Sequence, residues 1–131
     1  MARIPFTSEP ASEFGQLNIL VNNAGGQSPH PDDVMHMKRT ADRLFGDNYR
    51  WSVLGAGRAQ MPIAAMAAAM GGNVRVGLED SLWIGAGKLA PSKAAQVTQV
   101  RKIIEGLGLD IATPDEAREI LTLKGGDKVG F

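Results

Sequence analysis

The sequence contains no cysteine among its 131 residues. This absence excludes disulfide bonds, a thiolate nucleophile and any cysteine-ligated zinc or iron–sulfur site. A net charge is also lacking, because 14 lysines and arginines balance 14 aspartates and glutamates. Without a basic surplus, we expect no binding of nucleic acid or of an anionic membrane through bulk charge.

Long hydrophobic segments are missing as well. The longest apolar run, residues 61–70, is about half of the roughly 20 residues that a membrane-spanning helix needs. The N-terminus also lacks the apolar segment of a secretion signal. We therefore expect a cytoplasmic protein with no membrane partner.

The order of the hydrophobic segments predicts alternating strands and helices. Residues 1–16 are polar and have no regular period, which predicts an irregular N-terminal arm. Three apolar runs have the length of strands, and segments with a helical period lie between and after them. The runs span residues 17–21, 50–54 and 73–79, and the helical segments span 32–45, 60–70, 92–107 and 113–123. This order is typical of an α/β fold with right-handed βαβ units on a parallel sheet.

The segment NVRVGLED at residues 73–80 is the most informative for function. In α/β folds, ligands bind and catalysis takes place at the C-terminal ends of the strands. Two adjacent carboxylates at such an end can divide their roles, with one binding a metal and the other meeting a substrate. On an extended strand Arg75 and Glu79 would lie about 13 Å apart, so a contact between them requires a bend. The alternative is a surface turn in which Arg75 forms an ordinary ion pair.

Five segments, in this order, carry a resemblance to a known family. They are PHPDDVMHMKRTADRLFG, YRWSVLGAGRAQMP, AAAMGGNVRVGLEDS, LAPSKAAQV and ATPDEAREIL. The sequence from residue 29 onward resembles the C-terminal part of the β-keto acid cleavage enzymes. The resemblance implies a partial (β/α)8 TIM barrel over residues 17–131, comprising about the last three β/α units. It also implies a zinc-dependent reaction in which a β-keto acid and acetyl-CoA give acetoacetate and a new acyl-CoA.

The resemblance also implies roles for individual residues. Glu79 takes the place of a zinc ligand, and Asp80 that of the general base that removes a proton from the acetyl methyl group. Arg75 takes the place of the arginine that tunes this base. Gly55, Gly57 and Arg58 follow the penultimate strand, where late barrel loops bind phosphate, so they are expected to contact CoA phosphates or a substrate carboxylate. A tight turn with an exposed arginine is the alternative for these three residues.

Part of the expected enzyme is not in the sequence. A complete barrel needs about 250 residues, and the family's two zinc-binding histidines lie in H-x-H spacing on an early strand. His30 and His36 do not have this spacing and are not expected to bind zinc. We therefore expect this chain alone to be catalytically incomplete, and to associate with a complementing N-terminal half or with further copies of itself.

Two other interpretations remain open. The segment GQLNILVNNAGG at residues 15–26 resembles the Asn-Asn-Ala-Gly motif of the short-chain dehydrogenases. The turn at Gly55 and Gly57 also resembles a dinucleotide fingerprint with Glu79 near the ribose, although Gln60 replaces its last glycine. These features favour an NAD(P)-dependent oxidoreductase fragment of Rossmann type. The third interpretation is a fragment without catalytic function.

Overall fold

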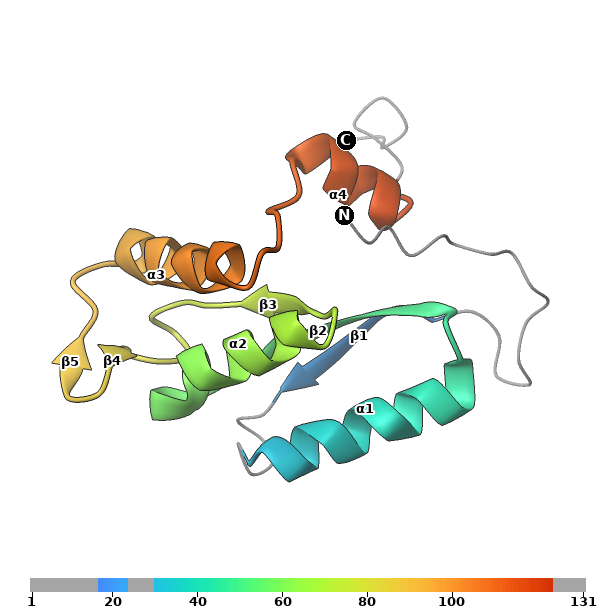
Figure 1. The fold of residues 1–131 in the computed structure, drawn as a ribbon, viewed down its shortest axis with the longest axis horizontal. Coiled ribbons are helices and arrows are strands. Elements are labelled where there is room, and N and C mark those ends of the chain that lie inside the picture. The colour runs from blue at the N-terminus through green and yellow to red at the C-terminus, as the bar shows by residue number, and fades with distance from the viewer. Residues whose placement is uncertain (1–16, 24–29, 124–131) are drawn as a thin grey trace.

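The computed structural model describes residues 17–23 and 30–123. In this part of the chain, a three-stranded sheet and a two-stranded hairpin are combined with helices (Figure 1). The elements are β1 (Leu17–Asn23), α1 (Pro31–Phe45), β2 (Tyr49–Leu54), η1 (Gly57–Ala59), α2 (Gln60–Ala69), β3 (Asn73–Arg75), β4 (Trp83–Gly85), β5 (Lys88–Leu89), α3 (Lys93–Gly106) and α4 (Pro114–Ile120). The predicted α/β class is therefore confirmed.

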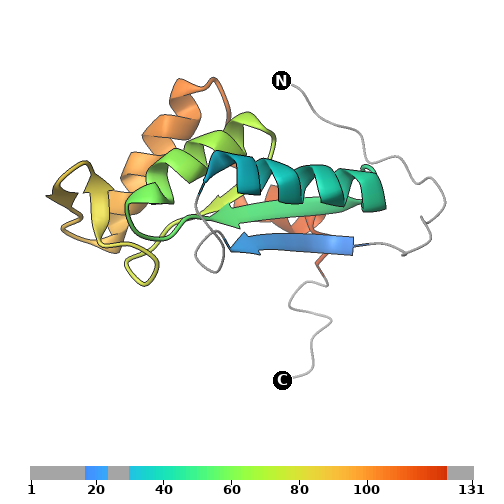
Figure 2. The same ribbon diagram turned by 90° about the horizontal axis from the view of Figure 1, so that it is seen from below.

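The three-stranded sheet has the order β1-β2-β3, and both strand pairs are parallel. Helix α1 connects β1 to β2, and α2 connects β2 to β3. Both helices lie on the same side of the sheet (Figure 2). Because the strands are parallel, the segments that follow β2 and β3 emerge at the same edge of the sheet, which brings the two predicted functional segments together.

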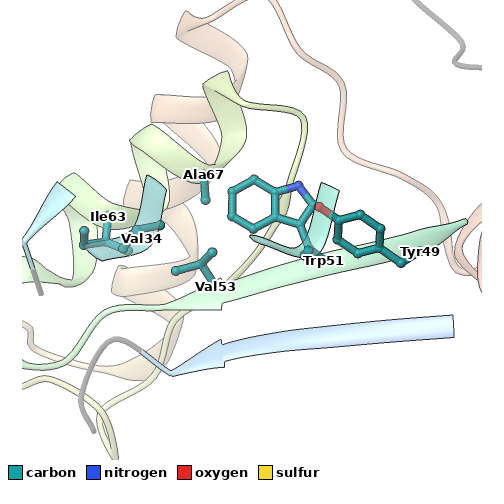
Figure 3. Packing of buried hydrophobic residues seen from close by; sticks show 7 residues of the cluster. Val34, Tyr49, Trp51, Val53, Ile63 and Ala67 are labelled. Atoms are coloured by element: carbon teal, nitrogen blue, oxygen red, sulfur yellow. The ribbon is translucent and has the colours of Figure 1, made fainter. Parts of the chain in front are cut away.

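The main hydrophobic core lies between β2 and these two helices. Side chains alternate along a strand, so Tyr49, Trp51 and Val53 of β2 share the face that α1 and α2 cover (Figure 3). The other buried members of this cluster are Val34, Ala41, Ile63 and Ala67. The opposite face of β2 carries Arg50 and Ser52. One face of β2 is therefore packed against helices, and the other also carries the buried Leu54.

Helix α2 packs on two sides, as its nearly uniform apolar sequence predicts. Ile63 and Ala67 join the main core, whereas Met61 and Ala64 form a second cluster with Val100 of α3. The many alanines of α2 allow the neighbouring elements to approach it closely. Helix α3 thereby packs beside α2, next to the segment that follows β3.

The structure differs from the sequence-based prediction in three places. The third strand ends at Arg75, not at Glu79, because the chain turns at Gly77: the backbone N–H groups of Asp80 and Ser81 donate to the Gly77 carbonyl at 3.2 and 3.1 Å. Helix α1 is capped by His30, whose Nδ1 accepts from the Asp32 backbone N–H at 3.3 Å, where we expected one of the two following aspartates as the cap. The β4–β5 hairpin was expected to be a loop, since strands of three and two residues are too short to show a period.

Other predictions concern local features. Thr113 and Glu116 form the predicted capping box at the start of α4. The predicted N-terminal arm, residues 1–16, lies outside the described residues, as do Ala24 and Gly25 of the dehydrogenase-like segment. The helices of the described part include none with both the length and the apolarity needed to cross a membrane.

Candidate functional site

The candidate site is built at the end of β3 by the turn of residues 77–81, which we call the acidic turn. Arg75 is the last residue of β3, and the acidic turn folds Glu79 and Asp80 back toward it. The Arg75 Nη2 atom lies 3.3 Å from Glu79 Oε1, and Arg75 Nε lies 3.1 Å from Asp80 Oδ2. The bend that a contact between Arg75 and Glu79 requires is therefore present. The two carboxylates do not point apart, because the guanidinium of Arg75 contacts both.

The two carboxylates differ in their exposure to solvent. The side chain of Asp80 is 14% exposed, against 47% for Glu79. The Oδ2 atom of Asp80 is buried, and within the described residues it forms the ion pair with Arg75 Nε but has no hydrogen-bond partner. A carboxylate oxygen whose lone pairs are not taken by a hydrogen-bond donor is free to accept a proton from a substrate placed beside it.

Glu79 is held in its ionised form. A hydrogen bond from its own backbone N–H and a second from Lys93 lower the pKa of its carboxyl group from the ordinary value of 4.5. Lys93 Nζ, at the start of α3, lies 3.2 Å from Glu79 Oε2. Because the pKa is lowered in the folded chain, these contacts stabilise the fold above the pKa of the unfolded chain. That contribution is lost as the pH falls through the pKa of the folded state.

Replacing Lys93 by methionine is expected to raise the pKa of Glu79 toward its ordinary value. The return should be incomplete, because the hydrogen bond from the backbone N–H of Glu79, the largest cause of the shift, stays in place. Titration of the Glu79 side-chain carboxyl by carbon-detected NMR measures this directly. A pKa that does not change in Lys93→Met would show that the lysine does not contact the carboxylate in solution.

The glycine-containing turn after β2 contacts the acidic turn. The backbone N–H of Gly57 donates to the Asp80 carbonyl at 2.9 Å. Gly57 has a φ of +57°, a left-handed conformation that favours glycine. Gly55 is buried against the start of α2, and Arg58 is exposed. The structure thus brings this turn and the acidic turn together. The Gly57 N–H is bonded to the Asp80 carbonyl, so it is not available to bind a pyrophosphate.

The described residues do not form a complete metal site. They contain no group of three or more histidine, cysteine, aspartate or glutamate side chains that could hold a metal ion. Both carboxylate oxygens of Glu79 contact cationic side chains. Since a catalytic zinc ion takes three protein ligands, the zinc ion that the resemblance implies does not fit this part of the chain by itself.

Three residues at the site were missed by the sequence analysis. Lys93 pairs with Glu79, while Gln60 and Gln96 donate hydrogen bonds to backbone carbonyls of the acidic turn. A signal for Lys93 was available, because it directly follows Ser92, a typical helix cap, at the start of the helix after the third strand. A buried glutamine in an apolar helix gives no comparable pattern.

Comparisons with known proteins identify relatives of this chain. The chain is 57% identical over 131 residues to the 3,5-dioxohexanoate:acetyl-CoA acetone transferase of Paraburkholderia graminis. The aligned region covers 100% of this chain and 39% of that relative. It is 53% identical over 74 residues to the 3-keto-5-aminohexanoate cleavage enzyme of Fusobacterium nucleatum, with 56% of this chain and 27% of that protein covered. It is 38% identical over 105 residues to the enzyme of the same name from Acetoanaerobium sticklandii, with 80% and 37% covered.

The chain spans no more than 39% of the length of these three relatives. The family described as beta-keto acid cleavage enzyme matches residues 12–123. This match includes the segment Asn22–Gly25 that resembles the short-chain dehydrogenases, so the segment lies within the same family region as the acidic turn. The chain belongs to the beta-keto acid cleavage enzyme family.

Proposed function

We propose that this chain forms the C-terminal part of an enzyme that converts a β-keto acid and acetyl-CoA into acetoacetate and a new acyl-CoA. The observation that carries the proposal is the contact of Arg75 with both Glu79 and the largely buried Asp80 at the C-terminal end of β3. Family membership and the name of the Paraburkholderia graminis relative, an acetyl-CoA acetone transferase, support the reaction class.

In the proposed reaction, Asp80 acts as the general base. It takes a proton from a carbon next to a carbonyl group: the C–H bond breaks, its electron pair moves toward the carbonyl oxygen as an enolate, and Asp80 becomes the neutral acid. Arg75 keeps the carboxylate oriented through the contact at 3.1 Å. The low exposure of the Asp80 side chain, 14%, limits its contact with water at the site.

The turn after β2 supplies the proposed substrate contacts. Gly57 fixes the turn to the Asp80 carbonyl, and Arg58, the next residue of this turn, is exposed. A guanidinium suits the phosphates of CoA or the carboxylate of the β-keto acid. Gly55 contributes by allowing the close packing of this turn on α2.

The described fold supports a portion of a TIM barrel rather than a whole one. Three parallel strands in sequential order, with both connecting helices on one side, are what a segment of such a barrel contains. The face of β2 that carries Arg50 and Ser52 then corresponds to the interior. Glu79 is one carboxylate ligand for zinc, and the other ligands come from outside the described residues.

Exposed apolar side chains support a further protein partner, either a complementing part of the barrel or additional copies of this chain. Eight large hydrophobic residues are at least 39% exposed. They are Leu82, Leu89, Val97, Leu107, Leu109, Ile111, Ile120 and Leu123. Helix α4 in particular has no fully buried residue in the described structure. Burial of such a surface by another protein segment is favourable.

A chimera tests the proposed function. The 131 residues of this chain replace the matching region of the Paraburkholderia graminis relative, to which they are 57% identical. We expect the chimera to form acetoacetate from a β-keto acid and acetyl-CoA, and to bind zinc, while this chain alone does neither. A folded chimera without acetoacetate formation contradicts the proposal, and robust cleavage by this chain alone contradicts its incompleteness. Titration with NADH tests the oxidoreductase alternative.

A further inference from the structure

Two glutamines are buried next to the acidic turn. Gln60, the first residue of α2, is 1% exposed, and Gln96 of α3 is 0% exposed. Together with Val34 and Val53 they are the largest fully buried side chains of the described part. Glutamine is mostly found at protein surfaces, so two such residues buried beside one turn require a specific reason.

Both side chains donate to backbone carbonyls of the acidic turn. Gln60 Nε2 donates to the Gly77 carbonyl at 3.0 Å. Gln96 Nε2 donates to the Ser81 carbonyl at 2.6 Å, with a longer contact of 3.4 Å to the Trp83 carbonyl. A carbonyl accepts only from the NH₂ half of the amide, which fixes the orientation of both side chains. The Oε1 atoms of both glutamines have no hydrogen-bond partner within the described residues, so the donated bonds are what these side chains contribute.

The two acceptors bracket the functional carboxylates. Gly77 precedes Glu79 by two residues, and Ser81 directly follows Asp80. The Gly57 N–H holds the Asp80 carbonyl between them at 2.9 Å. The acidic turn is therefore tied at three carbonyls, to the β2–α2 turn, to α2 and to α3.

The ion pairs with Arg75 cannot position the acidic turn to the same degree. The side chains of Arg75 and Glu79 are 53% and 47% exposed, and ion pairs open to water contribute little and exchange readily. Hydrogen bonds in the buried interior are stronger and are not in competition with water. The order of the turn is thus expected to come from the hydrogen bonds to its backbone carbonyls, two of which the buried glutamines donate.

We propose that Gln60 and Gln96 are positioning residues, which hold the acidic turn in the conformation that presents Asp80 and Glu79 to Arg75. The catalytic consequence rests on the proposed function, whereas the positioning itself does not. Neither glutamine contacts the reacting groups in this proposal. Each acts through a backbone carbonyl, so its effect is on the placement of the base.

Amide hydrogen exchange of the full 131-residue chain tests the positioning. The variants Gln96→Met and Gln60→Met retain the approximate size of the side chain and remove the donors. We expect exchange at the backbone N–H groups of Asp80 and Ser81, both bonded to Gly77, to become about ten-fold faster. The control is Gln99→Met, a half-buried glutamine on the same helix, which is expected to leave exchange unchanged.

Unchanged exchange at Asp80 and Ser81 in both glutamine variants would overturn the proposal. Protected amides elsewhere in α2 and α3 show whether each variant is folded. The two glutamines lie on different helices, so if one variant unfolds, the other variant still tests the proposal. The exchange result stands independently of the enzyme activity, so it remains decisive even where the chimera proves inactive and the proposed function fails.

The chimera provides the second measurement. There Gln96→Met is expected to lower kcat by about 10- to 100-fold with little change in KM, because the base is displaced while the substrate-binding groups are not. The Gln99→Met chimera should retain both constants. A loss confined to KM, with kcat intact, would contradict a positioning role.

Discussion

Replacement of Asp80 by asparagine in the chimera is expected to lower kcat by about 10²- to 10⁴-fold. Asparagine has the same shape as aspartate but cannot take up a proton, so the variant removes the base and little else. The fold should tolerate the change, because the partner Arg75 is 53% exposed and retains its contact with Glu79. Loss of such a partly hydrated pair costs less than about 1 kcal/mol. Steady-state kinetics and circular dichroism together separate the two effects.

The control for this variant is Asp110→Asn. Asp110 lies in an exposed segment between α3 and α4, and its replacement removes one negative charge without touching the acidic turn. Its kcat is expected to equal that of the unmodified chimera. A loss of less than about ten-fold in Asp80→Asn would assign the proton transfer to another group, since a positioned general base contributes at least about 10²-fold.

The position of Asp80 explains why its replacement is expected to affect kcat much more than the stability of the fold. Its side chain is 14% exposed but is joined to a single, half-exposed cation. In the proposed reaction, the burial matters because it keeps water away from the carboxylate that would take up the proton. The ion pair matters little for stability, because Arg75 remains hydrated. The same residue can therefore be important for turnover and nearly neutral for folding.

The sequence was sufficient for the order of the three sheet strands and the four α-helices, and for the residues that follow the third strand, but not for the β4–β5 hairpin. The apolar character of α2 predicts burial on more than one side, and the structure packs this helix into both hydrophobic clusters. The residues Arg75, Glu79 and Asp80 could be selected because ligands bind at the C-terminal ends of parallel strands. Their roles in the reaction remain predictions.

The bend that joins these residues could not be derived from the sequence pattern. A strand through Glu79 satisfies the alternation of apolar residues, with Val74, Val76 and Leu78 on one face. The chain instead turns at Gly77, where the absence of a Cβ leaves room for the Glu79 carboxylate against the backbone. This turn depends on donors from Gln60 and Gln96, which are distant in sequence. Contacts of this kind arise from tertiary packing, which single-sequence periodicity does not report.

Gly55→Ala is expected to destabilise the chain by about 1–3 kcal/mol through overpacking. A Cβ at this position would lie 2.9 Å from the Ala59 carbonyl oxygen and 3.0 Å from both Gln60 Cα and Ile63 Cβ. Two of these three atoms belong to the backbone at the start of α2, so they cannot move aside by a change of rotamer. Relief of the contact requires a shift of α2 itself, which also carries Gln60 away from the Gly77 carbonyl.

Urea unfolding followed by tryptophan fluorescence measures this loss, since Trp51 lies in the main core. With an m-value of about 2 kcal/mol/M, the expected change lowers the midpoint by about 0.5–1.5 M. Gly85→Ala is the matched control, because nothing lies within 4 Å of a Cβ at that exposed position and its φ is not positive. Equal midpoints for both variants would refute close packing at Gly55. A lower midpoint in Gly55→Ala, with no change in Gly85→Ala, would show that close packing requires a glycine at position 55. This explanation does not need any contact between Gly55 and a substrate.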